Sequence, residues 1–169
     1  GGFSTAQLLS GAPIFNSGAF VSGQAPIVIA YGSSENQSIG VDQNSRLIRH
    51  SDFEDFEVWT ESLTNQARRY SISNGSRIVG GAAGPKFDYI WTDLSLWVME
   101  YVGAPYVYTY NNIGTSCGLI AEHAQATFRG VTYWMGTSNF FAYGGGGSVQ
   151  TIPCSVWDAV FQDLDTTNA

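Results

Sequence analysis

The feature that most constrains the fold is a long run of alternating apolar and aromatic residues between Tyr89 and Gly147. In residues 89–110, apolar or aromatic side chains take nearly every second position until a Gly-Ala-Pro sequence interrupts them. A similar segment, 131–143, follows and ends in four glycines. Period-two alternation bounded by Gly, Pro, Asn and Ser is typical of antiparallel strands joined by tight turns. We therefore expect an all-β chain.

The spacing of the tryptophans indicates how these strands are grouped. Trp91 and Trp134 are 43 residues apart, and each is followed by a polar turn and a second aromatic strand. A repeat of about 40 to 50 residues with four short strands is the period of a β-propeller blade. Trp59 precedes Trp91 by only 32 residues, so the blades are expected to be degenerate. We predict at least two four-stranded antiparallel blades, with Trp91, Trp97 and Trp134 largely buried.

These patterns also divide the chain. Residues 1–24 are expected to be a linker or an incomplete blade, and residues 25–169 to hold propeller blades at roughly 25–80, 81–117 and 118–169. At most three blades can be counted, whereas a closed propeller needs about four to eight. The sequence is therefore interpreted as an incomplete propeller and an excerpt of a longer chain.

Two local signals stand out against the blade pattern. Asn74-Gly75 lies between two alternating segments, and both central residues of a type I′ turn need positive φ, so a β-hairpin is predicted there. The segment 155–164 changes to helical spacing, which predicts one short C-terminal helix. Its expected N-cap is Ser155, with Asp158 at N3. The helical spacing places four apolar residues on one face: Val156, Val160, Phe161 and Leu164.

Charge limits the partners. Charged residues make up only 12% of the chain, against about 25% in an average protein. The net charge is −7, and Arg68-Arg69 is the one adjacent pair among seven basic residues. Because nucleic-acid affinity is built from clustered cations, this balance argues against a phosphate-binding surface. No apolar run approaches the roughly 20 residues of a membrane-spanning helix, so no membrane-spanning segment is expected.

One acidic cluster invites a metal or general-acid interpretation. It comprises Asp52, Glu54, Asp55 and Glu57. Hard cations prefer several carboxylates on one loop, but the central glycine and terminal Glu of a calcium loop are absent. We therefore expect a solvated loop anchored by Phe53, Phe56 and Trp59, with no metal site.

The cysteines and histidines give no catalytic motif. Cys117 precedes His123 by six residues, yet no G-x-S-x-G elbow and no orienting Asn or Asp accompany them, so a structural turn is expected. Cys154 follows Cys117 by 37 residues without CxxC spacing. Two buried free thiols are expected, and neither a disulfide nor a zinc site. We assign no catalytic, cofactor-binding or metal-binding residue, and expect no enzyme.

Between residues 46 and 164 the chain resembles the propeller portion of tail nozzle or hub proteins of short-tailed bacteriophages. The resemblance rests on short motifs that occur in the family's order. They are RHSD at 49–52, NGSRIVG at 74–80, WTDLSLWVM at 91–99, GLIA at 118–121, YWMG at 133–136, FFAY at 140–143, VQTIPC at 149–154 and VWDAVF at 156–161. Family members are several times longer than this chain.

This resemblance implies a structural virion protein, a nozzle or hub component of the DNA ejection conduit below the portal and adaptor. Proteins similar to this chain form a homo-oligomeric ring, typically a hexamer, with tail fibres or spikes attached at the side. DNA would pass as transiting cargo, which an acidic wall would not retain. The expected location is the virion tail, assembled in the host cytoplasm, and no cofactor is implied.

Two other functional classes stay open. A carbohydrate-binding β-propeller, lectin-like or receptor-binding, would share the richness in Trp, Tyr, Gly and Asn. Exposed rings at Tyr106, Tyr108 and Tyr110 would favour it. A hydrolase would need two carboxylates about 5 to 10 Å apart. Its candidate residues are Asp52, Asp55, Asp88 and Asp93.

Overall fold

The computed structural model describes residues 9, 11–35, 42–162 and 164. These residues form three four-stranded antiparallel sheets followed by one short helix. In every sheet each strand pairs with the next strand along the chain. The predicted fold class, all-β with four-stranded antiparallel blades and a short C-terminal helix, is confirmed.

The sheets follow one another along the sequence. Sheet 1 consists of β1 (Gly18–Val21), β2 (Val28–Tyr31), β3 (Leu47–His50) and β4 (Arg68–Ser71). Sheet 2 consists of β5 (Ile78–Ala82), β6 (Asp88–Thr92), β7 (Ser95–Gly103) and β8 (Val107–Thr115). Sheet 3 consists of β9 (Gln125–Phe128), β10 (Val131–Met135), β11 (Phe140–Tyr143) and β12 (Gln150–Ile152), and α1 (Trp157–Phe161) follows it. Strand β1 thus lies within the 1–24 segment.

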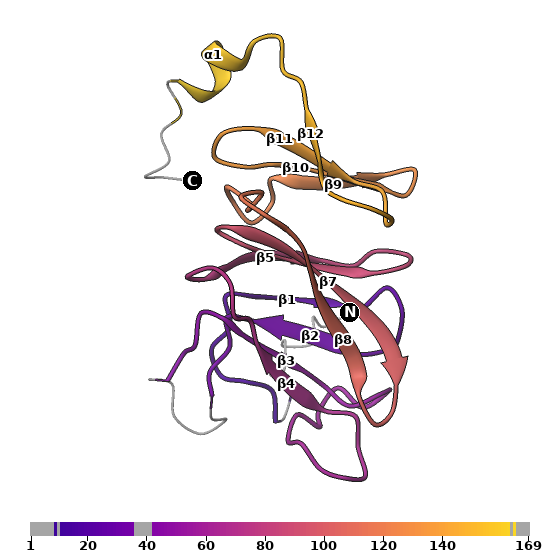
Figure 1. Ribbon diagram of the computed structural model, residues 1–169. Coiled ribbons are helices and arrows are strands. Elements are labelled where there is room, and N and C mark those ends of the chain that lie inside the picture. The colour runs from indigo at the N-terminus through magenta and orange to yellow at the C-terminus, as the bar shows by residue number, and fades with distance from the viewer. Residues whose placement is uncertain (1–8, 10, 36–41, 163, 165–169) are drawn as a thin grey trace, which may run out of the picture.

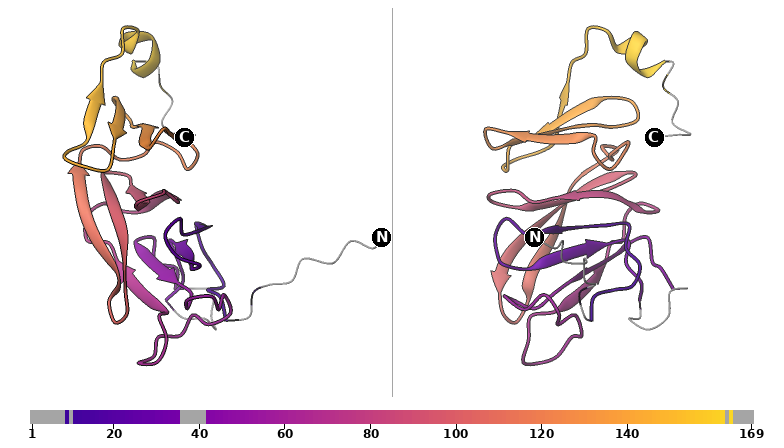
Figure 2. Two further views of the ribbon diagram at one scale, coloured as in Figure 1. Left: turned by 90° about the vertical axis from the view of Figure 1, so that its right-hand side faces the viewer. Right: turned by 180° about the vertical axis from the view of Figure 1, so that it is seen from behind.

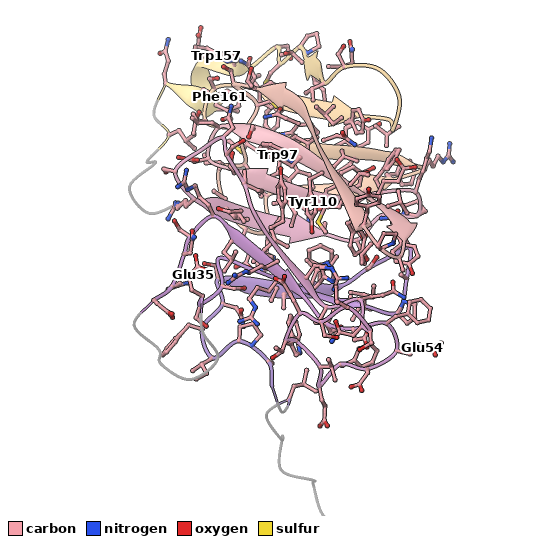
Figure 3. All side chains as sticks on the ribbon, turned by 60° about the horizontal axis from the view of Figure 1, so that its bottom comes forward. Glu35, Glu54, Trp97, Tyr110, Trp157 and Phe161 are labelled. Carbon is pink, nitrogen blue, oxygen red and sulfur yellow. The ribbon has the colours of Figure 1, made fainter. Side chains whose placement is uncertain are left out.

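The three sheets are stacked face to face, with sheet 2 between the other two (Figures 1 and 2). Successive side chains of a strand point to opposite faces, so each face of sheet 2 contributes to a separate core. The core between sheets 1 and 2 contains Ile29, Ile48 and Trp97, and Figure 3 shows Trp97 near Tyr110 there. The core between sheets 2 and 3 is built around Trp91 and Trp134.

The buried tryptophans confirm the prediction made for them. Trp91, Trp97 and Trp134 are 0%, 6% and 2% exposed. Trp91 on β6 and Trp134 on β10 point toward each other across the interface, with ring centroids 5.8 Å apart. Trp59 lies instead in the loop between β3 and β4, where its indole N–H donates to the carbonyl of Phe56 at 2.7 Å. The short Trp59–Trp91 interval therefore reflects a loop tryptophan.

The hairpin predicted at Asn74-Gly75 is wrong. β4 pairs with β3, and β5 pairs with β6, so this turn carries the chain from sheet 1 to sheet 2. Gly75 does have a positive φ of 98°. The turn is nevertheless held by sheet 2, because the backbone N–H of Ser76 donates to the Asp93 carboxylate at 2.8 Å. A long-range hydrogen bond thus overrides the local turn signal.

The capping prediction for the helix is also wrong. Helix α1 begins at Trp157, and its N-cap is Val156, which makes no side-chain cap hydrogen bond. Packing fixes this start, since the Trp157 indole N–H donates to the carbonyl of Ser138 at 2.7 Å. Phe161 packs edge-on against Phe140 of β11, with ring centroids 5.3 Å apart. Val156 is exposed, so it lies outside the packed face.

Candidate functional site

A cavity of about 470 Å³ opens where the tip of the β7–β8 hairpin meets the edge of sheet 1. Both strands of this hairpin are nine residues long, and the hairpin runs past sheet 2 along the side of sheet 1 (Figure 2). The lining includes His50, Arg68, Tyr70, Pro105, Tyr106 and Tyr110. Its lining combines aromatic rings with cationic and other polar side chains.

His50 is the buried polar group of this cavity. Its side chain is 1% exposed, and its Nδ1 lies 3.2 Å from the carbonyl oxygen of Ser51. Burial lowers the pKa of His50 to about 4, so the ring is neutral at pH 7. A proton on Nδ1 donates to Ser51 and leaves Nε2 as an acceptor. Within the described residues Nε2 has no hydrogen-bond partner.

The tyrosines of the cavity differ in exposure. Tyr106 is 79% exposed, whereas Tyr108 is buried and packs edge-on against the His50 ring at 5.1 Å. Tyr110 stacks on Tyr70 with ring centroids 3.9 Å apart, and its burial raises its pKa. Only Tyr106 therefore offers an open ring face, and the exposed cluster at Tyr106, Tyr108 and Tyr110 is not found.

Arg68 brings a cation to the same cavity. Its Nη1 donates to the carbonyls of Ser62, Asn65 and Ala67. The ion pairs found between described residues both involve Arg69. The cavity thus offers a cation and one exposed ring to a small polar ligand, while His50 Nε2 stays buried.

Asp88, a candidate for hydrolysis, instead joins two sheets. Its buried carboxylate accepts hydrogen bonds from Ser22 Oγ at 2.5 Å and from the backbone N–H of Gly23 at 2.9 Å. The Gln24 side chain also donates to it and contacts β7 through the Met99 carbonyl and the Tyr101 N–H. Burial raises the pKa of Asp88 although these hydrogen bonds oppose the rise. The group ties the β1–β2 turn to sheet 2.

The other candidate carboxylates are not paired with Asp88. Asp93 follows β6 and Asp88 begins it, so they are separated by about 16 Å of extended strand. Asp52 lies in the β3–β4 loop, where its Oδ1 accepts from the N–H groups of Phe53 and Gln66. Asp55 accepts from the N–H of Glu57 in the same loop. No group of three or more His, Cys, Asp or Glu suited to a metal ion occurs among the described residues.

The two cysteines are free thiols, as predicted, but only Cys117 is buried; Cys154 is half-buried. Burial raises the pKa of the Cys117 thiol, which disfavours a thiolate. Its carbonyl accepts the indole N–H of Trp134 at 2.7 Å, so this segment holds sheet 3 against sheet 2. His123 is exposed, and neither a hydrogen bond nor a ring contact joins it to Cys117 in the described structure.

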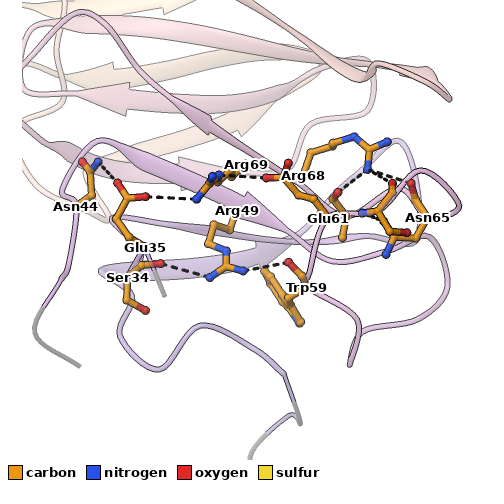
Figure 4. Close-up of polar contacts among 11 residues, drawn as sticks. Ser34, Glu35, Asn44, Arg49, Trp59, Glu61, Asn65, Arg68 and Arg69 are labelled. Atoms are coloured by element: carbon orange, nitrogen blue, oxygen red, sulfur yellow. Dashed lines mark hydrogen bonds and ion pairs between the residues drawn. The ribbon is translucent and has the colours of Figure 1, made fainter. Parts of the chain in front are cut away.

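The outer face of sheet 1 is covered by polar contacts (Figure 4). Arg49 on β3 is 7% exposed and donates to the carbonyls of Trp59 at 3.0 Å and Ser34 at 3.4 Å. Arg69 on β4 lies 3.7 Å from Glu35 and 3.3 Å from Glu61. The segments before β3 and after it are thereby drawn over this face.

The outer face of sheet 3 is apolar and far less covered. Tyr133 on β10 is 40% exposed, and Phe128 on β9 is 63% exposed. A hollow of about 400 Å³ lies beside them, with Met135, Phe140 and Ile152 in its lining. Helix α1 lies at the sheet 3 end of the stack (Figure 1), and its Phe161 packs on Phe140 of this face. The two ends of the stack therefore differ in chemistry.

Sequence reasoning missed both the cavity at His50 and the open face of sheet 3. The cavity joins residues of β3, β4 and the β7–β8 tip, which are distant in sequence. The open face had a readable signal, because Val131, Tyr133 and Met135 alternate with Thr132 and Trp134.

No described helix is long and apolar enough to cross a bilayer. Comparison with known protein families and with curated proteins finds no match to this chain.

Proposed function

We propose that this chain is a structural component of a short-tailed bacteriophage tail, a nozzle or hub protein that forms part of the DNA ejection conduit below the portal and adaptor. The proposal includes a homo-oligomeric ring, hexameric as in similar proteins, with portal or adaptor proteins and tail fibres or spikes as partners. It works in the virion after assembly in the host cytoplasm. No catalytic step is assigned to it.

One observation carries the proposal: the tryptophan-bearing motifs of the resemblance lie at the interfaces between sheets. The motif at 91–99 forms the turn and facing parts of β6 and β7, and the motifs at 133–136 and 140–143 form β10 and β11. Their large side chains Trp91, Trp97 and Trp134 are buried between sheets. The resemblance therefore rests on residues that determine the architecture.

The charge balance supports the same role. A conduit wall must let DNA move, and each cationic contact to phosphate would add affinity. The chain carries 14 acidic and seven basic residues. Arg49 and Arg69 are engaged in contacts on the outer face of sheet 1. We expect no tight binding of duplex DNA at physiological salt, and a filter-binding or anisotropy measurement checks it.

Particles carrying Trp134→Ala test the proposal directly. This side chain is buried, so its loss should disrupt sheet 3 and give particles that lack the nozzle or leak DNA. Leu63→Ala is the matched control, since Leu63 is fully exposed in the β3–β4 loop. Full infectivity with a normal tail for Trp134→Ala, or tight duplex binding by the purified protein, would make the nozzle proposal wrong.

A carbohydrate-binding module is the second candidate, and the cavity at His50 is the observation that favours it. Tyr106 could stack on a sugar ring, and Arg68 would donate hydrogen bonds to the sugar hydroxyls. Titration calorimetry with a glycan panel tests this. Binding that disappears in Tyr106→Ala but persists in Leu63→Ala would support it, and the absence of any glycan binding would exclude it.

A further inference from the structure

The hairpins at the centre of sheets 2 and 3 have the same cross-strand register. In both hairpins, two pairs of cross-strand neighbours point to one face of the sheet. In sheet 2 this is the face packed on sheet 3, and in sheet 3 it is the outer face. Each pair in sheet 3 lies 44 residues after its counterpart in sheet 2. The pairs are Tyr89↔Val98 and Trp91↔Leu96 in sheet 2, and Tyr133↔Ala142 and Met135↔Phe140 in sheet 3. All eight residues are apolar or aromatic. We call each set of two pairs a quartet.

The quartet of sheet 2 is the surface on which sheet 3 is packed. Its members are at most 3% exposed. They lie in one core with Trp134, Phe141 and Tyr143, which come from the facing side of sheet 3. In sheet 1 the corresponding set, Ile29↔His50 and Tyr31↔Ile48, is at most 2% exposed beneath sheet 2. Two quartets are therefore each covered by the next sheet.

The quartet of sheet 3 is likewise apolar and aromatic, but no described sheet covers it. Tyr133 is 40% exposed, and Met135, Phe140 and Ala142 are half-buried. The neighbouring strands continue the apolar face with Phe128 on β9 and Ile152 on β12. Within the described strands no Lys, Arg, Asp or Glu points to this side. An apolar face of this kind is a recognition surface.

We infer that the outer face of sheet 3 is a docking surface for a fourth four-stranded antiparallel sheet, stacked on sheet 3 as sheet 3 is stacked on sheet 2. The covering sheet presents an uncharged face with large aromatic residues on its two central strands, the positions that Trp134 and Phe141 hold toward sheet 2. All strands of the described residues already belong to sheets 1 to 3, so this sheet comes from further polypeptide. The inference does not rest on the phage proposal.

The stacking rule argues against a second copy of this chain as the occupant. Both observed interfaces join the quartet side of one sheet to the opposite side of the next. In a second copy, the faces opposite the quartets of sheets 2 and 3 are already covered by sheets 1 and 2. The face opposite the quartet of sheet 1 would therefore have to make the contact. That side is closed by the Arg49 contacts with Trp59 and Ser34 and by the Arg69 ion pairs. A second copy thus offers no surface of the required kind.

Helix α1 does not replace the missing sheet. It has five residues and contacts the face through Phe161 on Phe140, at one side of the quartet. Tyr133 stays exposed with the helix in place. In a complete stack, α1 would lie beside the fourth sheet.

Thiol labelling tests the inference in two states of the protein. On a Cys154→Ser background, Tyr133→Cys and Phe128→Cys place probes on the face, and Leu63→Cys is the exposed control far from it. Cys117 is buried and free, so it contributes little background. Alkylation rates are measured by mass spectrometry for the purified chain at low micromolar concentration and for the protein as its source produces it.

In the purified chain we expect both face probes to react within about tenfold of the control, because nothing covers them. In the protein from its source, both should slow by about 100-fold or more while the control keeps its rate. Equal rates in the two states, equal slowing of the control, or protection that grows with concentration of the purified chain would overturn the inference. The last outcome would identify a second copy as the cover.

Discussion

The two ends of the stack bury their outer faces differently. On sheet 1 the segments around β3 and β4 close the face, with Arg49, Arg69, Glu35 and the Trp59 loop in contact over it. On sheet 3 the face carries Tyr133, Met135 and Phe140, and among the described elements α1 alone lies against part of it. The first face is completed by its own chain. The second has the residues of an interface and no sheet against it.

The difference follows from which residues alternate along the strands. In sheet 1, β3 and β4 place arginines on the outer face, where loop carbonyls and carboxylates satisfy them. Burial lowers the pKa of Arg49, yet its two carbonyl acceptors and the nearby carboxylates of Glu61, Glu35 and Asp42 favour the charged form. In sheet 3 the same alternation places apolar side chains outward. The type of side chain on the outer face of an end sheet, charged or apolar, thus determines whether loops of the chain or another sheet can cover that face.

The largest predicted effect separates the two faces of a single strand. Trp134→Ala should lower the free energy of unfolding by about 3–5 kcal/mol, because it leaves a cavity between sheets 2 and 3. Tyr133→Ala, one residue earlier and on the open face, should cost less than about 1 kcal/mol in the purified chain. Chemical denaturation of both variants measures this contrast. Similar losses for the two would show that the outer face is already packed.

The next effect concerns His50, the histidine of the covered quartet of sheet 1. His50 has a pKa of about 4 against an ordinary 6.5. Its neutral form therefore contributes stability that is fully present above pH 6.5 and is lost as pH falls from 6.5 toward 4. The loss is about 3 kcal/mol, since each pKa unit corresponds to about 1.4 kcal/mol.

Unfolding free energies of wild type and His50→Phe between pH 7 and pH 4 isolate this contribution. The advantage of wild type over the variant should shrink by about 3 kcal/mol over that interval. A constant difference between wild type and His50→Phe would contradict the buried, neutral histidine.

A smaller effect tests the closed face of sheet 1. Arg49→Met removes the donors to the carbonyls of Trp59 and Ser34, and should destabilise the chain by about 2 kcal/mol. Arg69→Met removes two solvent-exposed ion pairs and should cost less than about 1 kcal/mol. Faster proteolysis of the β3–β4 loop in Arg49→Met would accompany the loss. Equal effects for both arginines would show that Arg49 does not hold the loops.

The smallest effect on stability is expected at the edge of the open face. Phe128→Ser replaces a side chain that is 63% exposed, so the free energy of unfolding should change by less than about 0.5 kcal/mol. Binding of a hydrophobic dye by the purified chain should decrease. An unchanged dye signal would indicate that this edge contributes no accessible apolar surface.

Part of this architecture could be read from the sequence because it depends on local periodicity. Alternation predicted the strands around Trp91 and Trp134, and their burial followed from it. Their spacing of 43 residues was close to the true offset, although equivalent positions are 44 apart and the two rings come from facing sides of the interface. Because side chains alternate between the two faces of a strand, a shift of one residue moves a side chain from one face of the sheet to the other.

Other features depend on contacts between distant segments and could not be read from the sequence. Asn74-Gly75 has the local signature of a hairpin, but the Asp93 carboxylate binds Ser76 and places the turn between sheets. The start of α1 is set by Trp157 on the β10–β11 turn, not by a capping residue. The cavity at His50 exists only because the long β7–β8 hairpin folds along sheet 1.

Oxidative footprinting of the purified chain tests the central claim most directly, because it compares closed and open faces in one sample. We expect Trp59, Trp91 and Trp134 to be protected and Tyr133 and Trp157 to be labelled, in line with their exposures of 3%, 0%, 2%, 40% and 39%. Labelling of Trp59 as rapid as that of Trp157 would show that sheet 1 is not closed by its loops. Protection of Tyr133 equal to that of Trp134 would show that the face of sheet 3 is not open.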